Sequence, residues 1–299
     1  MKHLFGYACL SDLKPTIKVG STSTLTYINK LPLDKRGPYL LAKARNNIVA
    51  LRQILEHNKQ QRIKAYRLPD DFMPMADLGY YDIAKHFARD LADIGALANK
   101  YDMFLSFHPS QFFVLNSATP RVVDSAILNF NIFASILDMM QLRNKPILLT
   151  HVGARSTYAT RELAVQAFCD NFQRLSPAAQ RYFAVENDQA AHSIDSCVDI
   201  HRAIGIPVVI DNAHYNYNPI PGVPLADATK LAMSTWHNQV PKVHLSSELA
   251  GSPRHAHADY INRQDFLDFY HAIKSTGIDR VIFMVEAKKK DRAVVQLRS

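Results

Sequence analysis

Three short stretches, ILLTHV at residues 147–152, FAVEN at residues 183–187 and PVVIDN at residues 207–212, decide the fold. Each is an almost continuous apolar run with a histidine, a glutamate or an aspartate near its end. Apolar runs of this length are typical of strands that are covered on both faces in a parallel sheet. The intervals between them are long enough for a crossover helix. The three stretches therefore predict consecutive βα units.

The same pattern extends along the chain. Five further runs share it, namely Leu4–Leu10, Ala65–Leu68, Met103–His108, Lys242–Ser247 and Arg280–Ala287. Helical periodicity lies between the runs, as at Ile48, Leu51 and Leu55. No GxGxxG or GxxxxGK[ST] motif follows any run, which disfavours a doubly wound sheet. We therefore predict an α/β fold, a single (β/α)8 TIM barrel that comprises residues 1–299 as one domain.

Composition narrows the class of protein. The 299 residues are 47% hydrophobic and 21% charged, as in an ordinary globular protein. The three cysteines (Cys9, Cys169 and Cys197) lack CxxC spacing and fit a reducing compartment. Neither a signal-peptide pattern nor a long apolar run occurs, so we expect a cytoplasmic protein, nucleoid-associated in a bacterium, with no membrane partner. The net charge of +8 would attract a polyanion such as nucleic acid, although a basic surface has many causes.

Imidazole and carboxylate side chains follow six predicted strands. They are His108, His151, Glu186, Asp211 with His214, His244 and Glu286, and His257 lies in a following loop. The carboxyl ends of barrel strands face one mouth, so these groups should gather there. One such histidine or aspartate is usually structural, but three carboxylates together would repel unless cations neutralise them. The combination predicts two or three divalent ions, and mixed ligands suit zinc, manganese or iron.

The other histidines have a simpler interpretation. Seven of them lie off the strand ends or on predicted helices and are expected to be surface or packing residues: His3, His57, His86, His192, His201, His237 and His271. His255 stays open, because it lies two residues before His257 and either could face a metal.

Several segments resemble the UV damage endonucleases. They occur in that family's order and are Leu4-Phe5-Gly6-Tyr7, His108-Pro109-Ser110-Gln111-Phe112, Asn187-Asp188 after Glu186, Asp211-Asn212-Ala213-His214, Lys242–Ser247, Pro253–Asp259 and Glu286-Ala287-Lys288-Lys289-Lys290. The resemblance covers nearly the whole chain. It implies a barrel like that of endonuclease IV-type enzymes, which nicks damaged double-stranded DNA immediately 5′ of a lesion. It also implies a metal cluster, commonly of Mn²⁺, and products with a 3′-hydroxyl and a 5′-phosphate.

The resemblance also assigns roles by position. It makes six residues the ligands of two ions, namely Glu186, Asp211, His214, His244, His257 and Glu286. His108 and His151 would serve a third ion, with Glu186 as the bridge. Glu186, Lys242 and Glu286 would be catalytic, and Lys242 matches a lysine that can be carboxylated. The alternative for Lys242 is an ordinary cation near a phosphate.

Recognition of DNA would need other residues. By resemblance, Tyr7, Gln111 and Phe112 would probe the duplex, whereas barrel packing is the alternative for the two aromatic residues. A further group, comprising Lys288, Lys289 and Arg254, would contact phosphates unless it is only a solvated surface run. We expect a monomer with no obligate protein partner.

The chain departs from the family in its first half. It has Arg67-Leu68-Pro69-Asp70-Asp71 where the family usually reads Arg-Ile-Ser-Ser, and Leu78 replaces a histidine of the third metal site. Asp77 beside it could replace that ligand, or the third site could be weak or empty. Phe112 lacks a tyrosine hydroxyl, and Ser11 stands near an expected asparagine. Lesion specificity is therefore harder to predict than nuclease chemistry.

Two functions of other classes remain open at this stage. A metal-dependent sugar isomerase or epimerase would use a similar barrel and similar ligands, and isotope exchange on sugars would identify it. A DNA-binding relative without catalysis would bind a damaged duplex without nicking it. The basic rim argues against the first, and the full set of carboxylates argues against the second.

Overall fold

The computed structural model describes residues 1–237, 239–249, 251–252 and 256–298. Eight parallel strands pair in the order β6-β5-β4-β3-β2-β1-β8-β7. Their bounds are β1 (Lys2–Ala8), β2 (Ala65–Leu68), β3 (Phe104–Phe107), β4 (Ile147–His151), β5 (Phe183–Glu186), β6 (Val208–Val209), β7 (Lys242–Leu245) and β8 (Arg280–Val285). A parallel bridge between Asp211 and His244 joins the two ends of this order. The strands thus form a nearly closed barrel, and the predicted fold is confirmed.

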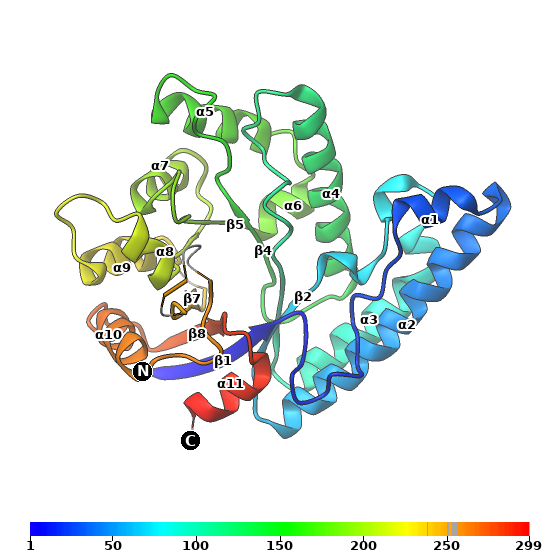
Figure 1. Cartoon of the computed structure of the whole chain (residues 1–299), viewed down its shortest axis with the longest axis horizontal. Helices are drawn as coiled ribbons and strands as arrows, with labels where there is room; N and C mark the ends of the chain where they lie inside the picture. The colour runs from blue at the N-terminus through cyan, green and yellow to red at the C-terminus, as the bar shows by residue number, and fades with distance from the viewer. Residues whose placement is uncertain (238, 250, 253–255, 299) are drawn as a thin grey trace.

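Helices surround this barrel (Figure 1). They are α1 (Leu25–Lys30), α2 (Leu33–Gln60), α3 (Ile83–Lys100), α4 (Pro120–Met139), α5 (Arg161–Phe172), α6 (Pro177–Tyr182), α7 (Ile194–Ile204), α8 (Asn212–Tyr217), α9 (Leu225–Ser234), α10 (Arg263–Lys274) and α11 (Lys290–Leu297), with short 3₁₀ turns η1 (Asp70–Phe72) and η2 (Ala76–Leu78). Side-chain oxygens of Asp82, Thr160 and Asn262 cap α3, α5 and α10. Such caps satisfy amide groups that the first helical turn leaves unpaired.

The main core lies between the barrel and its helices. The rings of Phe107 and Phe133 are 4.9 Å apart, and those of Phe130 and Phe183 are 5.0 Å apart. These contacts hold α4 against β3 and β5. Helix α4 is also the one described helix with the length and hydropathy that a membrane span needs. Its inner residues pack on the strands, as those of a barrel helix do.

The inward-facing residues form layers inside the barrel. Leu4, Ile282 and Met284 belong to an apolar cluster near the amino ends of the strands. Gly6 follows, and a Cβ there would lie 2.5 Å from the side chain and carbonyl oxygen of Ala65. Only glycine allows β1 and β2 to approach this closely. Because side chains alternate along a strand, the inward-facing positions nearer the carboxyl ends of the strands are those that reach the mouth.

Most strands end earlier than the apolar runs that predict them, and β1 and β6 show the reason. The run Leu4–Leu10 ends its pairing at Ala8, because Cys9 adopts a left-handed backbone with φ of 64°. The run Pro207–Asn212 pairs only at Val208–Val209. The side chain of Asn187 instead accepts a hydrogen bond from the amide of Asp211. Both strands therefore end early, where polar groups of the mouth begin.

Candidate metal centre

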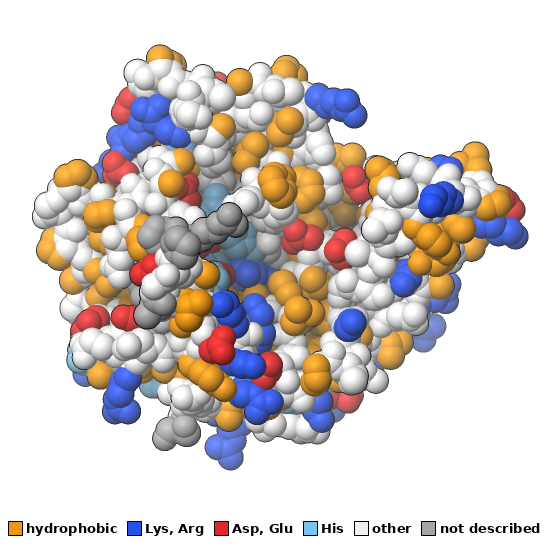
Figure 2. All heavy atoms as spheres, in the orientation of Figure 1, with side chains coloured by type: hydrophobic (Ala, Val, Ile, Leu, Met, Phe, Trp, Pro, Cys, Tyr) orange, Lys and Arg blue, Asp and Glu red, His pale blue; other side chains and the backbone are white. Residues whose placement is uncertain are grey.

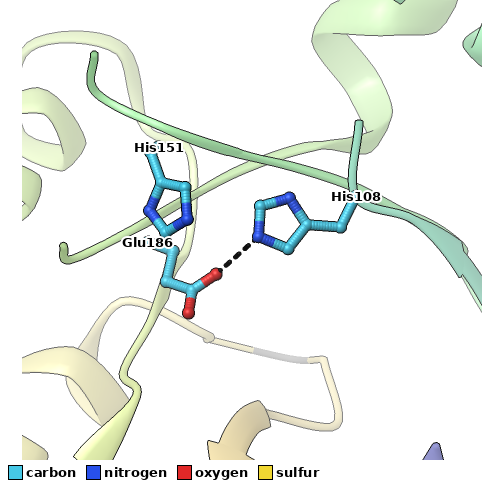
Figure 3. Close-up of side chains that lie close together, drawn as sticks. All are labelled: His108, His151 and Glu186. Atoms are coloured by element: carbon cyan, nitrogen blue, oxygen red, sulfur yellow. Dashed lines mark ion pairs between the residues drawn. The ribbon is translucent and has the colours of Figure 1, made fainter. Parts of the chain in front are cut away.

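Glu186 lies at the centre of the mouth. It is the last residue of β5, it is fully buried, and imidazoles from three other segments surround its carboxylate. The Oε2 atom lies 2.9 Å from Nε2 of His108, and Oε1 lies 2.9 Å from Nδ1 of His244 and 3.5 Å from Nδ1 of His214. Figure 3 shows the His108 ring directed at the carboxylate, with His151 beside it. One carboxylate is thus shared by ligand candidates from the residue after β3, from β7 and from α8.

Glu286 forms a second focus just after β8. Its Oε1 atom lies 3.2 Å from Nδ1 of His244, and its Oε2 atom lies 3.5 Å from Nε2 of His257. His244 therefore stands between the two glutamates. His257 is more exposed than the histidines around Glu186, with 40% of its side chain accessible. The loop after β7 brings it to the edge of the site.

The candidate ligands form three overlapping groups. Within each group the ligand atoms lie within 4.8 Å of one another: His108 with His151 and Glu186; Glu186 with Asp211 and His214; and Asp211 with His244 and Glu286. A metal site needs several donor atoms at such separations. The structure therefore brings the predicted ligands His108, His151, Glu186, Asp211, His214, His244 and Glu286 together, and His257 adjoins Glu286.

Unpaired nitrogen atoms indicate that this cluster fits a metal. Nδ1 of His108, Nδ1 of His151 and Nε2 of His244 are buried and have no hydrogen-bond partner among the residues that the structure describes. A buried polar atom without a partner costs roughly 1–3 kcal/mol. Three such atoms in one mouth would destabilise the folded state of an ordinary core. Neutral imidazoles and carboxylates are, however, the donors that a divalent transition metal prefers.

The protonation states suit the same interpretation. Burial lowers the pKa of His108 to about 3, so its imidazole is neutral at physiological pH. Burial by itself would raise the pKa of Glu186, but the neighbouring His244 and His151 hold it well below its usual range. Burial also opposes protonation of His214, yet Asp211 and Glu186 raise its pKa to about 10. A metal bound there would have to displace that proton.

Backbone and side-chain contacts orient the ligands. The Asp211 carboxylate accepts hydrogen bonds from the amides of Ala213 and His214 and from the hydroxyl of Ser246. It therefore caps α8 while one oxygen still faces the mouth. The amide group of Asn187 in turn bonds the backbone of Asp211. Partners of this kind hold ligands in place before a metal binds.

Lys242 lies one layer deeper than the predicted ligands. It is 2% exposed, and its Nζ donates to Oγ of Ser106 over 2.6 Å. Burial, together with the nearby Arg67 guanidinium, lowers the pKa of Lys242 to about 7. A substantial fraction of neutral amine is therefore available at neutral pH. An amine in that state can react with carbon dioxide, whereas an ammonium cannot.

Arg67 is a site residue that we did not predict. It points into the mouth from β2, its side chain is 16% exposed, and it forms an ion pair with Glu286. The guanidinium and His244 hold the pKa of Glu286 far below its usual range against the opposing effect of burial. The signal was available in the sequence, because Arg67 lies two residues after Ala65 and must face the same side of the strand.

The structure corrects the predicted role of Tyr7 and gives Ser11, a departure from the family, a structural contact. Tyr7 is fully buried, and its hydroxyl donates to Oδ1 of Asn58 on α2. Its side chain faces the helices, because alternation along β1 turns it away from the side of Gly6. Ser11 is 5% exposed and donates to the buried carboxylate of Asp291. Neither residue can probe DNA in this conformation, and packing is the better explanation for Tyr7.

Gln111 and Phe112 do lie on the rim. Both are exposed, and 78% of the Phe112 side chain is accessible. They line a cavity of about 470 Å³ that also reaches His151 and His214. A second, shallower hollow brings the same two rim residues next to Arg67, Glu186 and Glu286. Figure 2 shows the hollowed mouth with histidine side chains at its floor. The predicted probing pair thus adjoins the candidate metal ligands.

The other predicted DNA contacts, and Asp77 as a possible third-site ligand, differ in how far the structure supports them. Lys288 is exposed, while Lys289 is half-buried and lies 3.8 Å from the carboxylate of Asp12. Arg254 and His255 lie outside the described residues. Asp77 and Leu78 are exposed in η2, and neither belongs to a candidate metal group among the described residues. The structure therefore does not support Asp77 as a replacement for the lost histidine ligand.

The seven histidines expected to be structural also stay outside these groups within the part of the chain that the structure describes. His57 bonds the Asp291 carboxylate over 2.9 Å. His192 and His201 each contact a backbone carbonyl, of Ala154 and Ile206 respectively. His3 packs edge-on against Phe5 and Tyr270.

The fold and the site define a (β/α)8 barrel whose mouth holds overlapping groups of histidine and carboxylate side chains that could bind metal ions. The family described as UV-endonuclease UvdE matches residues 3–299. The chain therefore belongs to this family of endonucleases.

Individual proteins that are similar to the chain agree with this family. It is 31% identical over 300 residues to a protein of Bacillus cereus (strain Q1) named UV DNA damage endonuclease, with 98% of this chain and 92% of the relative covered. A crystal structure named SacUVDE is similar at a TM-score of 0.87 and 27% identity, with 99% and 96% covered. A D-tagatose 3-epimerase-like protein has a TM-score of 0.58 at 14% identity, covering 100% and 94%. This last likeness shows a common fold alone.

Proposed function

We propose that the protein is a metal-dependent DNA repair endonuclease that nicks duplex DNA immediately 5′ of UV photoproducts and other distorting lesions. Its products would carry a 3′-hydroxyl and a 5′-phosphate. The observation that supports this most is the position of Glu186, shared between imidazoles whose other nitrogens are buried and unpaired. Family membership and the names of the relatives point to damaged DNA as the substrate.

The residues of the mouth would have distinct roles. Glu186, Asp211 and Glu286 would hold two ions together with His214, His244 and His257, while His108 and His151 would complete a third site. Bound divalent ions would lower the pKa of a coordinated water and neutralise the phosphodiester. Arg67 keeps Glu286 ionised, and the buried position of Lys242 keeps its amine partly neutral. A carboxylated Lys242 would add an anionic ligand beneath the ions. Mn²⁺ is the ion that we propose.

Lesion recognition would fall to the exposed rim. Phe112 can stack on a base, and stacking on an aromatic side chain contributes roughly 1–3 kcal/mol per base. Extruding a nucleotide costs least where a lesion has already weakened its pair. The cavity beside Phe112 has room for an extruded group. The protein would therefore sense distortion of the duplex more than the chemical identity of a lesion, and it would act as a monomer.

A nicking assay tests the proposal. An end-labelled duplex with one defined photoproduct or abasic site is incubated with protein and Mn²⁺, with EDTA, and beside an undamaged duplex. We expect a metal-dependent cut at the first phosphodiester 5′ of the lesion and almost none in the controls. Religation by a DNA ligase checks for the 3′-hydroxyl and 5′-phosphate. A folded protein that binds Mn²⁺ but makes no cut would refute the proposed activity.

A further inference from the structure

The positive charge of the chain is concentrated at its start. Residues 1–64 contain twelve lysines and arginines against three acidic residues, a net charge of +9. Residues 65–299 contain twenty-three basic and twenty-four acidic residues, a net charge of −1. The basic character of the protein therefore comes from β1, α1, α2 and the loops between them. A charge this local can act on a polyanion only where that part of the fold lies.

The first part of this region projects from the barrel. Helix α2 has 28 residues and rises about 42 Å. The longest strand, β1, has seven residues and spans about 23 Å. Since α2 returns the chain from the mouth to the start of β2, its extra length of about 20 Å extends beyond the mouth. Figure 1 shows α1 and the start of α2 protruding to one side. We name residues 13–45 the arm.

The arm is held in one position by buried contacts. The side chain of Asn47 exchanges hydrogen bonds with the backbone of Ser21 and also donates to carbonyl groups of Asp71 and Phe72. A guanidinium nitrogen of Arg36 donates to the hydroxyl of Tyr80 over 2.7 Å. The arm and the loop between β2 and α3 thus form one wall. Both belong to βα connections, which in this fold surround the active-site mouth.

The surface chemistry of the arm suits nucleic acid. It has seven basic residues, Lys14, Lys18, Lys30, Lys35, Arg36, Lys43 and Arg45, and one acidic residue, Asp34. Among the described residues, only Lys35 of these seven forms an ion pair, with Asp34. Leu25, Tyr27 and Leu33 are 52%, 46% and 72% exposed. Ammonium groups bind phosphates, and exposed apolar groups can pack on sugars and bases.

The base of the arm carries negative charge, in contrast to the basic residues of the arm. Asp71 is exposed there, in the loop between β2 and α3 whose backbone accepts a hydrogen bond from Asn47, and it would repel a phosphate backbone. A strand of DNA would therefore meet the arm farther out, beyond this carboxylate. The 20 Å that α2 adds beyond the mouth corresponds to about six base pairs, roughly half a turn of B-DNA. We propose that the arm binds the phosphate backbone of duplex DNA on one flank of the lesion, about half a turn from the scissile bond.

This inference rests on the proposed function, but its first test does not need nicking. The triple variant K30Q/K35Q/K43Q, which changes lysines of α1 and the first half of α2, is compared with wild type for binding to an undamaged 30-base-pair duplex in EDTA, from 50 to 200 mM salt. Each phosphate contact contributes about 0.9 to the slope of log K against log salt. We expect the slope to become shallower by about 2–3. A matched triple, K100Q/K230Q/K274Q, removes exposed lysines from α3, α9 and α10 and should leave the slope unchanged.

Either of two results would overturn the inference. An unchanged slope in the arm variant would show that these lysines do not contact DNA. An equal change in both triples would show that only overall charge matters.

A second test locates the contact. Duplexes carry the lesion with 4 or 20 base pairs on either side, and nicking is measured with Mn²⁺. Wild type should act about tenfold better when one particular flank is long, and the arm variant should lose this preference while cutting the short duplex normally. A preference that survives in the variant contradicts the arm as its cause. If no duplex is nicked but the salt slope still changes, the proposed activity fails and the DNA-binding arm stands.

Discussion

The mouth of the barrel has two unlike sides. From β3 to β8, strand ends deliver imidazoles and carboxylates that meet within hydrogen-bonding distance around Glu186 and Glu286. From β1, β2 and the loop that follows His108, the chain delivers a buried Tyr7, the cation Arg67, a long basic arm and the exposed Phe112. Most ligands of the first side lie at or directly after a strand end; His214 on α8 and His257 in a loop are the exceptions. The second is built from loops and a projecting helix, and there the departures from the family occur.

The difference teaches where each part of the function resides. Side chains alternate along a strand, so residues two apart both face the barrel interior or both face the helices. Loops follow no such rule, and their contacts depend on partners far away in the sequence. Bond making should therefore respond to changes on the first side, and selection of DNA should respond to changes on the second. The following substitutions test this division.

Glu186→Ala should have the largest effect. Removing the shared carboxylate leaves three imidazoles without their anion, and we expect bound metal to be lost and nicking to fall at least about 1000-fold. Metal analysis and the nicking assay measure the two effects. Glu162→Ala on α5, which removes a carboxylate that is 71% exposed, is the matched control and should behave as wild type. Normal turnover with normal metal content in Glu186→Ala would remove this residue from the site.

Lys242→Met should lower nicking by about 10- to 100-fold and change the pH dependence of stability. The folded protein releases the Lys242 proton near pH 7, whereas the unfolded chain holds it up to about pH 10.5. Because the unfolded state binds more protons in that window, this lysine makes stability rise with pH, by at most about 1.4 kcal/mol per unit. The benefit is lost as the pH falls through 7.

The check for Lys242 is urea unfolding of wild type and variant at pH 7, 8 and 9 in EDTA. The free energy of unfolding should rise more steeply with pH in wild type than in Lys242→Met. Lys274→Met, on the exposed last turn of α10, should leave the wild-type slope in place. Parallel curves for Lys242→Met and wild type would contradict a pKa of Lys242 near 7.

Phe112→Ala should act on selection and not on chemistry. Loss of stacking predicts that the preference for damaged over undamaged duplex drops roughly 5- to 150-fold, with metal content unchanged. Competition between the two duplexes in one nicking reaction measures the ratio directly. Leu163→Ala, which truncates an exposed apolar side chain on α5, serves for comparison. A lower metal content in Phe112→Ala would instead place this residue on the chemical side of the mouth.

Tyr7→Phe should have the smallest effect. It removes one buried hydroxyl that donates to Asn58, so we expect a loss of about 1 kcal/mol in the free energy of unfolding. Lesion preference should stay within twofold of wild type, since the ring never reaches the surface. Thermal unfolding and the competition assay give both values. A large loss of lesion preference with normal stability would restore Tyr7 as a probing residue.

The site was more predictable than the recognition surface for a physical reason. His108, His151, Glu186 and His244 follow apolar runs whose strand character is clear, so their gathering at one mouth follows from topology. Tyr7 sits in an equally clear strand, but the prediction placed it at the mouth without considering that its neighbour Gly6 faces the barrel interior. Arg67 was overlooked in the same way. Ser11 bonds Asp291, 280 residues away, and no local pattern contains that contact.

The sequence by itself determined the barrel, the order of its strands and the chemical types that would line its mouth, because apolar runs and their polar ends are local features. Only the tertiary structure decided how these groups share protons and partners. The low pKa of His108, the lowered pKa of Lys242 and the pairing of Arg67 with Glu286 all arise from burial beside particular neighbours. The projection of the arm likewise depends on the length of α2 relative to the barrel. Burial and proximity are properties of the folded chain, and electrostatic energies follow from them.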